Sequence, residues 1–239
     1  MKKGVLFMAF DFEQCRQWYA GIPFDADMAP SLCMLTSVSP TASLTGSTCP
    51  VQLCDTDHPE HAARLCRAAQ DAGRCVTVLL TKDGNYPCDR LLVPIERYSA
   101  CRGSAPCVGV RFSYDVKAPD ILSKILQYAD LGITLIDAYP ENPQMREEGA
   151  QQALLAELQR AAEALYDRNR NGQPIEFLPF STMGLYAKHG IGAHRNARCQ
   201  ECSHHAVCGG RRLSYADCEV KKMLADCAVY LSVPLSGEG

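Results

Sequence analysis

The sequence has no apolar run of about 18 residues, so we expect no membrane-spanning helix. It also lacks an excess of charge of one sign. Its 24 basic and 27 acidic residues leave a net charge of -3, which gives no general electrostatic reason to bind nucleic acid or an anionic membrane. The apolar stretch at residues 5–10 is too short for a signal peptide, and no small-residue cleavage site follows it. We therefore expect a cytoplasmic protein with neither a nucleic-acid nor a membrane partner.

Cysteine is the residue type that the chain has in unusual abundance. Fourteen of the 239 residues are cysteines, while 47% of the chain is hydrophobic and 21% is charged. The hydrophobic share is enough for a sizeable core and excludes wholesale disorder. A cytosolic chain keeps its thiols reduced, so this density indicates metal or iron–sulfur ligation at some cysteines and ordinary packing at others.

Short apolar runs alternate with helix-like segments over the first 180 residues. The runs typical of buried strands cover residues 5–10, 32–38, 76–81, 108–113, 133–138 and 175–180. Helical spacing of apolar residues covers 61–72, 118–131 and 144–168, with Gly73, Gly132 and Gly172 as the predicted helix ends. Six strands separated by helix-length connections favour an α/β fold around a parallel sheet, either open or curled into a barrel.

Composition changes after residue 180. Residues 181–210 are rich in Gly, His, Arg and Cys and poor in aliphatic residues, and a last helical pattern covers 215–231. Such a stretch cannot build a core by itself. We expect a first domain over residues 1–180 and a small cysteine-rich extension over 181–239, folded onto the first domain or around a metal.

The strongest motif lies in this extension. Cys199, Cys202 and Cys208 precede two glycines, which gives the spacing C-x2-C-x5-C-G-G. Two intervening residues let the first two sulfurs share a metal, and the glycines permit close approach of the backbone. Tetrathiolate sites suit a 4Fe-4S cluster or zinc. Cys218 and Cys227 are the candidates for a fourth ligand, and we favour Cys218 because it needs less chain reversal.

This spacing after an α/β domain resembles the C-terminal SPASM or twitch extension of radical S-adenosylmethionine (radical SAM) enzymes that mature peptides. In that family the extension carries auxiliary 4Fe-4S clusters, and the upstream domain is a partial (β/α)6 barrel. Residues 110–115, V-R-F-S-Y-D, resemble the family's fourth strand, which often ends in Ser-x-Asp. The resemblance therefore implies a partial (β/α)6 barrel-like domain over 1–180 and a SPASM/twitch-like extension over 181–239.

The chain departs from the family where S-adenosylmethionine would bind. The family holds its catalytic cluster with C-x3-C-x2-C after the first strand, and here only Cys15 matches, with Asp11 and Trp18 at the other positions. One thiolate and one carboxylate do not suit that cluster. The family's Gly-Gly-Glu-Pro segment corresponds to residues 46–50, where Gly46 is present but the acid is missing. The resemblance thus implies Cys15 and Gly46 as cofactor-binding positions, while the departures weigh against S-adenosylmethionine as a cofactor.

The resemblance, taken with these departures, implies a degenerate radical SAM/SPASM-like iron–sulfur protein with one 4Fe-4S cluster and no assigned catalytic residue. Such a protein would serve as an accessory in the maturation of a ribosomal peptide or protein. It would bind a precursor peptide or a catalytic radical SAM partner, or relay electrons. One alternative is an active radical SAM peptide-modifying enzyme with unusual cluster ligands, and another is a zinc-stabilised α/β binding protein. Glu141, shortly after the predicted strand 133–138, indicates either a ligand contact at the barrel mouth or a turn.

Overall fold

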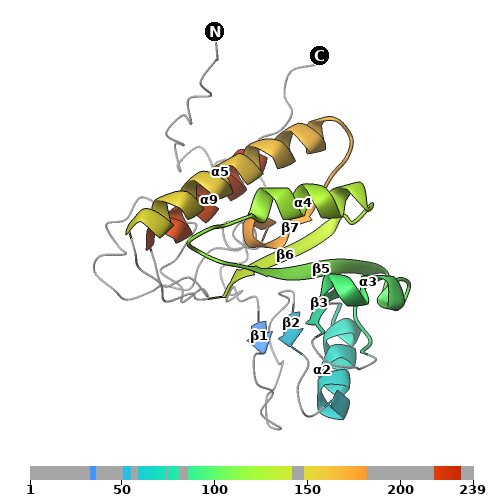
Figure 1. Cartoon of the computed structure of the whole chain (residues 1–239). Helices are drawn as coiled ribbons and strands as arrows, with labels where there is room; N and C mark the ends of the chain where they lie inside the picture. Colours follow the sequence, from blue (N-terminus) through green and yellow to red (C-terminus); the bar gives the residue numbers. More distant parts are fainter. Residues whose placement is uncertain are drawn as a thin grey trace.

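The chain folds around one parallel sheet whose strands follow each other in sequence order (Figure 1). This computed structural model describes residues 33–35, 51–54, 59–73, 75–80, 86–141, 148–181 and 218–232. The strands are β1 (Cys33–Leu35), β2 (Val51–Cys54), β3 (Val76–Leu79), β4 (Arg90–Val93), β5 (Cys107–Tyr114), β6 (Leu135–Pro140) and β7 (Glu176–Phe177). The helices with assigned bounds are α2 (Pro59–Asp71), α3 (Ile95–Cys101), α4 (Ile121–Asp130), α5 (Glu148–Arg170) and α9 (Cys218–Ser232).

The predicted α/β class with a parallel sheet is confirmed, because all six neighbouring strand pairs are parallel. The predicted number of six strands is wrong, because the described residues alone form seven. The two unexpected strands, β2 and β4, have four residues each, and a proline directly precedes the one and follows the other. Helix α3, which begins after Pro94, was also not expected from the sequence. The strand predicted at residues 5–10 lies outside the described part of the chain.

The predicted helix ends are confirmed. Gly73, Gly132 and Gly172 follow α2, α4 and α5, and their φ angles lie between +70° and +77°. This left-handed conformation carries little steric cost for glycine, and it ends a helix by turning the chain away from the axis.

Helices α2, α4, α5 and α9 pack on the same face of the sheet. Side chains of paired residues in neighbouring parallel strands project from the same face, as do those of residues two apart in one strand. Val78 pairs with Leu91. Val93 pairs with Val110, which pairs in turn with Ile136. These five residues therefore share one face, and they belong to the apolar clusters that include α2 at one end and α4, α5 and α9 at the other (Figure 1).

Helix α9, from the predicted C-terminal extension, belongs to the main hydrophobic core. Leu224 and Ala228 are buried in the same cluster as Leu154 and Leu158 of α5 and Ile125 of α4. Figure 1 shows α9 running beside α5. The end of the extension is thus anchored on the body of the sheet. Among the described helices, none combines the length and the apolar character needed to cross a membrane.

The face of the sheet opposite the helices carries a small apolar cluster of Leu79, Leu92 and Leu135. At its centre, β5 and β6 approach so closely that a Cβ on Gly109 would lie 2.3 Å from the carbonyl oxygen of Leu135. Only glycine fits at that position. The three leucines are buried, and Leu178, in the short helical segment that follows β7, packs against them.

Candidate functional site

Polar side chains gather where β5 and β6 approach their carboxyl ends, on the face opposite the helices. Arg111 of β5 pairs with Asp137 of β6, and Ser113 pairs with Tyr139 two residues further along. Glu141 follows directly after β6. Ligand sites of parallel α/β proteins form at this end of the strands, because the loops there are free to carry binding groups. We therefore treat these five residues as the candidate site.

Arg111 and Asp137 form a partly buried ion pair. The Arg111 Nε atom lies 2.9 Å from Asp137 Oδ2, and the guanidinium carbon lies 4.2 Å from the centre of the Tyr139 ring. Burial raises the pKa of the Asp137 carboxyl to about 6, although the Arg111 charge acts in the opposite direction. Desolvation of the carboxylate therefore outweighs its attraction to the guanidinium, and Asp137 changes its charge near neutral pH.

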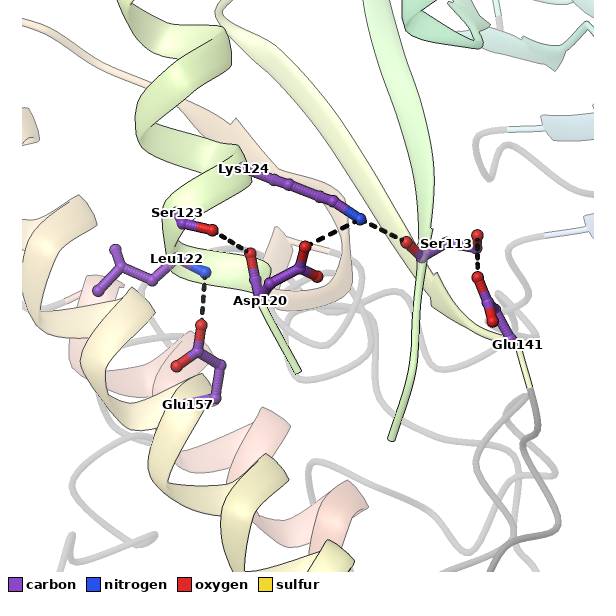
Figure 2. Close-up of polar contacts among 7 residues, drawn as sticks. All are labelled: Ser113, Asp120, Leu122, Ser123, Lys124, Glu141 and Glu157. Carbon is purple, nitrogen blue, oxygen red and sulfur yellow. Dashed lines mark hydrogen bonds and ion pairs between the residues drawn. The ribbon is translucent and has the colours of Figure 1, made fainter. Parts of the chain in front are cut away.

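A second set of contacts positions Glu141 at the rim of the site (Figure 2). The Ser113 hydroxyl donates a hydrogen bond of 2.8 Å to Glu141 Oε1. The Lys124 ammonium, from α4, donates to the backbone carbonyl of Ser113 at 3.0 Å and pairs with Asp120 at 3.2 Å. Helix α4 thus holds the end of β5, and Ser113 in turn orients an exposed carboxylate. This hydrogen bond gives Glu141 a structural role at the end of β6. The ligand contact expected there from the sequence stays a prediction.

The start of α4 is held by a residue of a different helix. Glu157 of α5, which is 4% exposed, accepts a hydrogen bond of 2.8 Å from the backbone N–H of Leu122. Figure 2 shows this carboxylate reaching the first turn of α4, and its other oxygen pairs with Arg160. Asp120, which stands at the N-cap position, makes no side-chain capping bond. Glu157 therefore satisfies an N–H group that would otherwise be without a helical partner.

A further ion pair lies on the same face of the sheet, nearer the amino ends of the strands. Arg90, the first residue of β4, lies 2.7 Å from Glu176, the first residue of β7. Ser181 also donates to Glu176, at 3.2 Å. By the strand register, Leu92 lies one layer further along β4 than Arg90, whereas Leu135 is the direct partner of Glu176. Arg111 and Asp137 lie one layer beyond Leu92 and Leu135. We assign a structural role to the Arg90 pair, because it is distant from the strand ends where ligands bind.

Most of the residues predicted from sequence to bind cofactor or metal lie outside the described part of the chain: Cys15, Gly46, Cys199, Cys202 and Cys208. Cys218 is the first residue of α9. The alternative fourth ligand, Cys227, is fully buried, and its thiol donates to the Leu158 carbonyl oxygen at 3.7 Å. Burial raises the pKa of the Cys227 thiol, which disfavours the thiolate that a metal needs.

The other described cysteines behave as packing residues. Burial raises the pKa of the Cys66 thiol to about 11 and that of Cys88 to about 12, so both stay protonated at neutral pH. The pKa values of Cys75 and Cys107 are raised for the same reason. Within the described residues, no group of three or more His, Cys, Asp or Glu side chains is arranged to hold a metal ion.

Comparison with models of protein families, with characterised proteins and with solved structures finds no match to the chain.

Asp137 and Tyr139 were not predicted from the sequence as site residues, although a signal for Asp137 was present. An aspartate within the apolar run 133–138 must be buried in any parallel sheet, and a buried carboxylate requires a partner. Arg111 is likewise a charged residue within a predicted strand, the run 108–113.

Proposed function

We propose that this chain is a degenerate radical SAM/SPASM-like iron–sulfur protein that acts as an accessory in the maturation of a ribosomal peptide or protein. In this proposal the body of the chain is a partial barrel. Its mouth receives a precursor peptide or a catalytic partner, and its C-terminal extension holds one 4Fe-4S cluster. When bound, such a cluster supplies one-electron transfer, so the accessory role is binding or electron relay.

The winding of the sheet is the observation that carries the proposal. The described strands are all parallel and follow each other in sequence order, and helices α2, α4, α5 and α9 pack on one face. A doubly wound sheet reverses its strand order and carries helices on both faces, whereas a (β/α) barrel winds in one direction with helices outside. The strand order and the placement of these helices therefore support the proposed barrel-like body.

Two further contacts favour a curled sheet. Strands lie about 4.8 Å apart, so β4 and β7 would be about 14 Å apart in a flat sheet with β5 and β6 between them. The Arg90 and Glu176 side chains nevertheless meet at 2.7 Å, which curvature toward this face makes easier. Burial of Leu79, Leu92 and Leu135 on the same face also agrees with the filled interior of a barrel.

The donor set in the extension suits the proposed cluster by its chemistry. Cys199, Cys202 and Cys208 provide thiolates in the spacing C-x2-C-x5-C, and soft sulfur ligands are what an iron–sulfur cluster requires. The core position of Cys227 supports Cys218 as the fourth ligand, because Cys227 is already bonded to the Leu158 carbonyl oxygen. Helix α9 carries both cysteines, so the cluster would be tethered to the core through this helix.

The proposal is tested by the metal content of the full chain after anaerobic purification. We expect about four irons and four sulfides per chain with absorbance near 400 nm, as for a 4Fe-4S cluster. Cys199→Ala, Cys202→Ala and Cys208→Ala should each lower the bound iron, and Cys227→Ala is the matched control that should retain it. Zinc without iron would support the zinc-stabilised alternative. Unchanged metal in the first three variants would overturn the ligand assignment.

A further inference from the structure

We propose that Arg111, Asp137 and Tyr139 form a binding site for the carboxylate of a small ligand or peptide, which takes the place of Asp137 beside the guanidinium. The site lies on the sheet face opposite the helices, next to Ser113 and Glu141 at the carboxyl ends of β5 and β6. The inference does not depend on a metal in the C-terminal extension.

The guanidinium of Arg111 has donors to offer. An arginine carries five N–H groups, and within the described residues its one acidic partner is Asp137. The Arg111 Nε lies 2.9 Å from Asp137 Oδ2, yet its buried N–H makes no hydrogen bond of good geometry there. One quarter of the Arg111 side chain is exposed, so the side chain is not sealed from a ligand. Tyr139 lies against the guanidinium at 4.2 Å and holds it in place.

The charges around Arg111 favour a carboxylate over a phosphate. Asp137 and the rim residue Glu141 are both acidic, so a dianion would meet repulsion that a singly charged planar group feels less. A guanidinium binds a carboxylate in bidentate geometry. In the free site, Arg111 carries one positive charge and Asp137 one negative charge. When the ligand is bound, its carboxylate supplies the negative charge and Asp137 is protonated, so the net charge of the pair is unchanged.

Binding of a carboxylate beside Arg111 is also coupled to uptake of a proton by Asp137. The pKa of the Asp137 carboxyl is already raised to about 6, and a second carboxylate beside Arg111 raises it further. The other charged groups on neighbouring strands are engaged elsewhere, because Glu176 of β7 pairs with Arg90 of β4. On β5, Cys107 is a neutral thiol whose pKa is raised by burial, so Arg111 is the charge that faces Asp137. Affinity for a carboxylate should therefore fall about tenfold per pH unit above pH 6.

The experiment compares N-acetylglycine with its uncharged amide, N-acetylglycinamide, by calorimetric titration of the full chain at pH 6.5 and pH 7.5. We expect the acid to bind and the amide not to bind, with affinity for the acid about tenfold weaker at the higher pH. Asp137→Asn mimics the protonated carboxyl, so its affinity should be independent of pH. Arg111→Gln should abolish binding. Arg168→Gln, which removes an arginine from the exposed pair with Asp130, is the matched control that should bind as the wild type does.

Arg111→Gln leaves a buried carboxylate without its partner, and this variant could fail to fold. In that case the neutral double variant Arg111→Gln/Asp137→Asn is compared with Asp137→Asn alone, and loss of binding only in the double variant supports the site. Equal binding of acid and amide, or binding that survives removal of Arg111, would overturn the proposal. Stronger binding of inorganic phosphate than of N-acetylglycine would overturn the choice of ligand. Iron content should be the same in all these variants, which separates this result from the metal-binding test.

Discussion

Asp137 is the residue at which burial and charge act most clearly against each other. Its carboxyl is largely desolvated, and the Arg111 guanidinium compensates only part of the cost, so its pKa is raised rather than lowered. Most acidic residues with an arginine partner show the opposite direction. A position in the middle of an apolar strand therefore makes the charge state of this pair sensitive to pH near neutrality.

The raised pKa predicts how folding stability changes with pH. The folded-state pKa of Asp137 is about 6 and its ordinary value is 3.8, so the folded chain binds the proton more tightly. The resulting stabilisation is fully present below about pH 4 and is lost as pH rises through about 6. Urea unfolding of the wild type should show this loss, and Asp137→Asn should show a flatter profile over the same range. The exposed Asp130→Asn variant is the control, and identical pH profiles for wild type and Asp137→Asn would contradict the assignment.

At the scale of elements, helix α4 joins the helical layer to the candidate site. Its first turn is held by Glu157 of α5, and its Lys124 binds the Ser113 carbonyl oxygen at the end of β5 (Figure 2). The Ser113 hydroxyl then orients Glu141. The geometry of the site rim thus depends on the contacts that α4 makes with α5 and with β5.

Removing the Glu157 carboxylate should destabilise the first turn of α4. Glu157→Ala leaves the Leu122 N–H without its partner, and we expect unfolding to become easier by about 1–3 kcal/mol. Arg160→Ala removes the charged partner of the same carboxylate but keeps its bond to the Leu122 N–H, and its effect should be smaller than that of Glu157→Ala. Chemical denaturation of both variants measures the difference. Equal losses would show that the capping bond contributes nothing beyond the ion pair with Arg160.

The contact between β5 and β6 predicts a strict requirement for glycine. Gly109→Ala would bring its Cβ within 2.3 Å of the Leu135 carbonyl oxygen and within 2.8 Å of the Leu135 Cβ. Because backbone must move, we expect a loss of about 3 kcal/mol. The loss should be the same in a Leu135→Ala background, since the oxygen and the Cβ remain there. Thermal unfolding of the single and double variants gives both values, and full rescue by Leu135→Ala would refute a backbone clash.

The periodicity of the sequence predicts the fold class and the longer elements, but it does not predict the short strands or the site. The apolar residues of β2 are interrupted by Gln52, and β4 has only three apolar residues before Pro94, so neither forms an apolar run as long as those at 76–81 and 133–138. The meeting of Arg111 with Asp137 depends on the register of two strands, which contacts between distant segments determine. The ligand assignment of Cys199, Cys202 and Cys208 stays a prediction from spacing alone.

For the whole molecule, the described strands wind in one direction, and α9, at the end of the proposed C-terminal extension, packs into the main hydrophobic core. The position of Cys15, with Asp11 and Trp18 where the resemblance calls for cysteines, gives the amino-terminal segment one thiolate of the three needed for a catalytic cluster. The extension keeps its three closely spaced cysteines. This asymmetry is the reason for proposing an accessory protein rather than an enzyme.

The asymmetry predicts that the protein does not cleave S-adenosylmethionine. Anaerobic incubation of the full chain with a strong reductant and S-adenosylmethionine should release no 5′-deoxyadenosine above the protein-free background, as measured by chromatography. Release of 5′-deoxyadenosine that disappears in Cys15→Ala would instead establish the active enzyme with unusual cluster ligands.

The most direct test of the account is a Mössbauer spectrum of chain produced with ⁵⁷Fe and purified without oxygen. We predict the signal of one 4Fe-4S cluster in the wild type and in Cys15→Ala, and its loss in Cys202→Ala. A spectrum without cluster iron, or a cluster signal that survives in Cys202→Ala and disappears in Cys15→Ala, would contradict the proposed assignment of the metal site to the C-terminal extension.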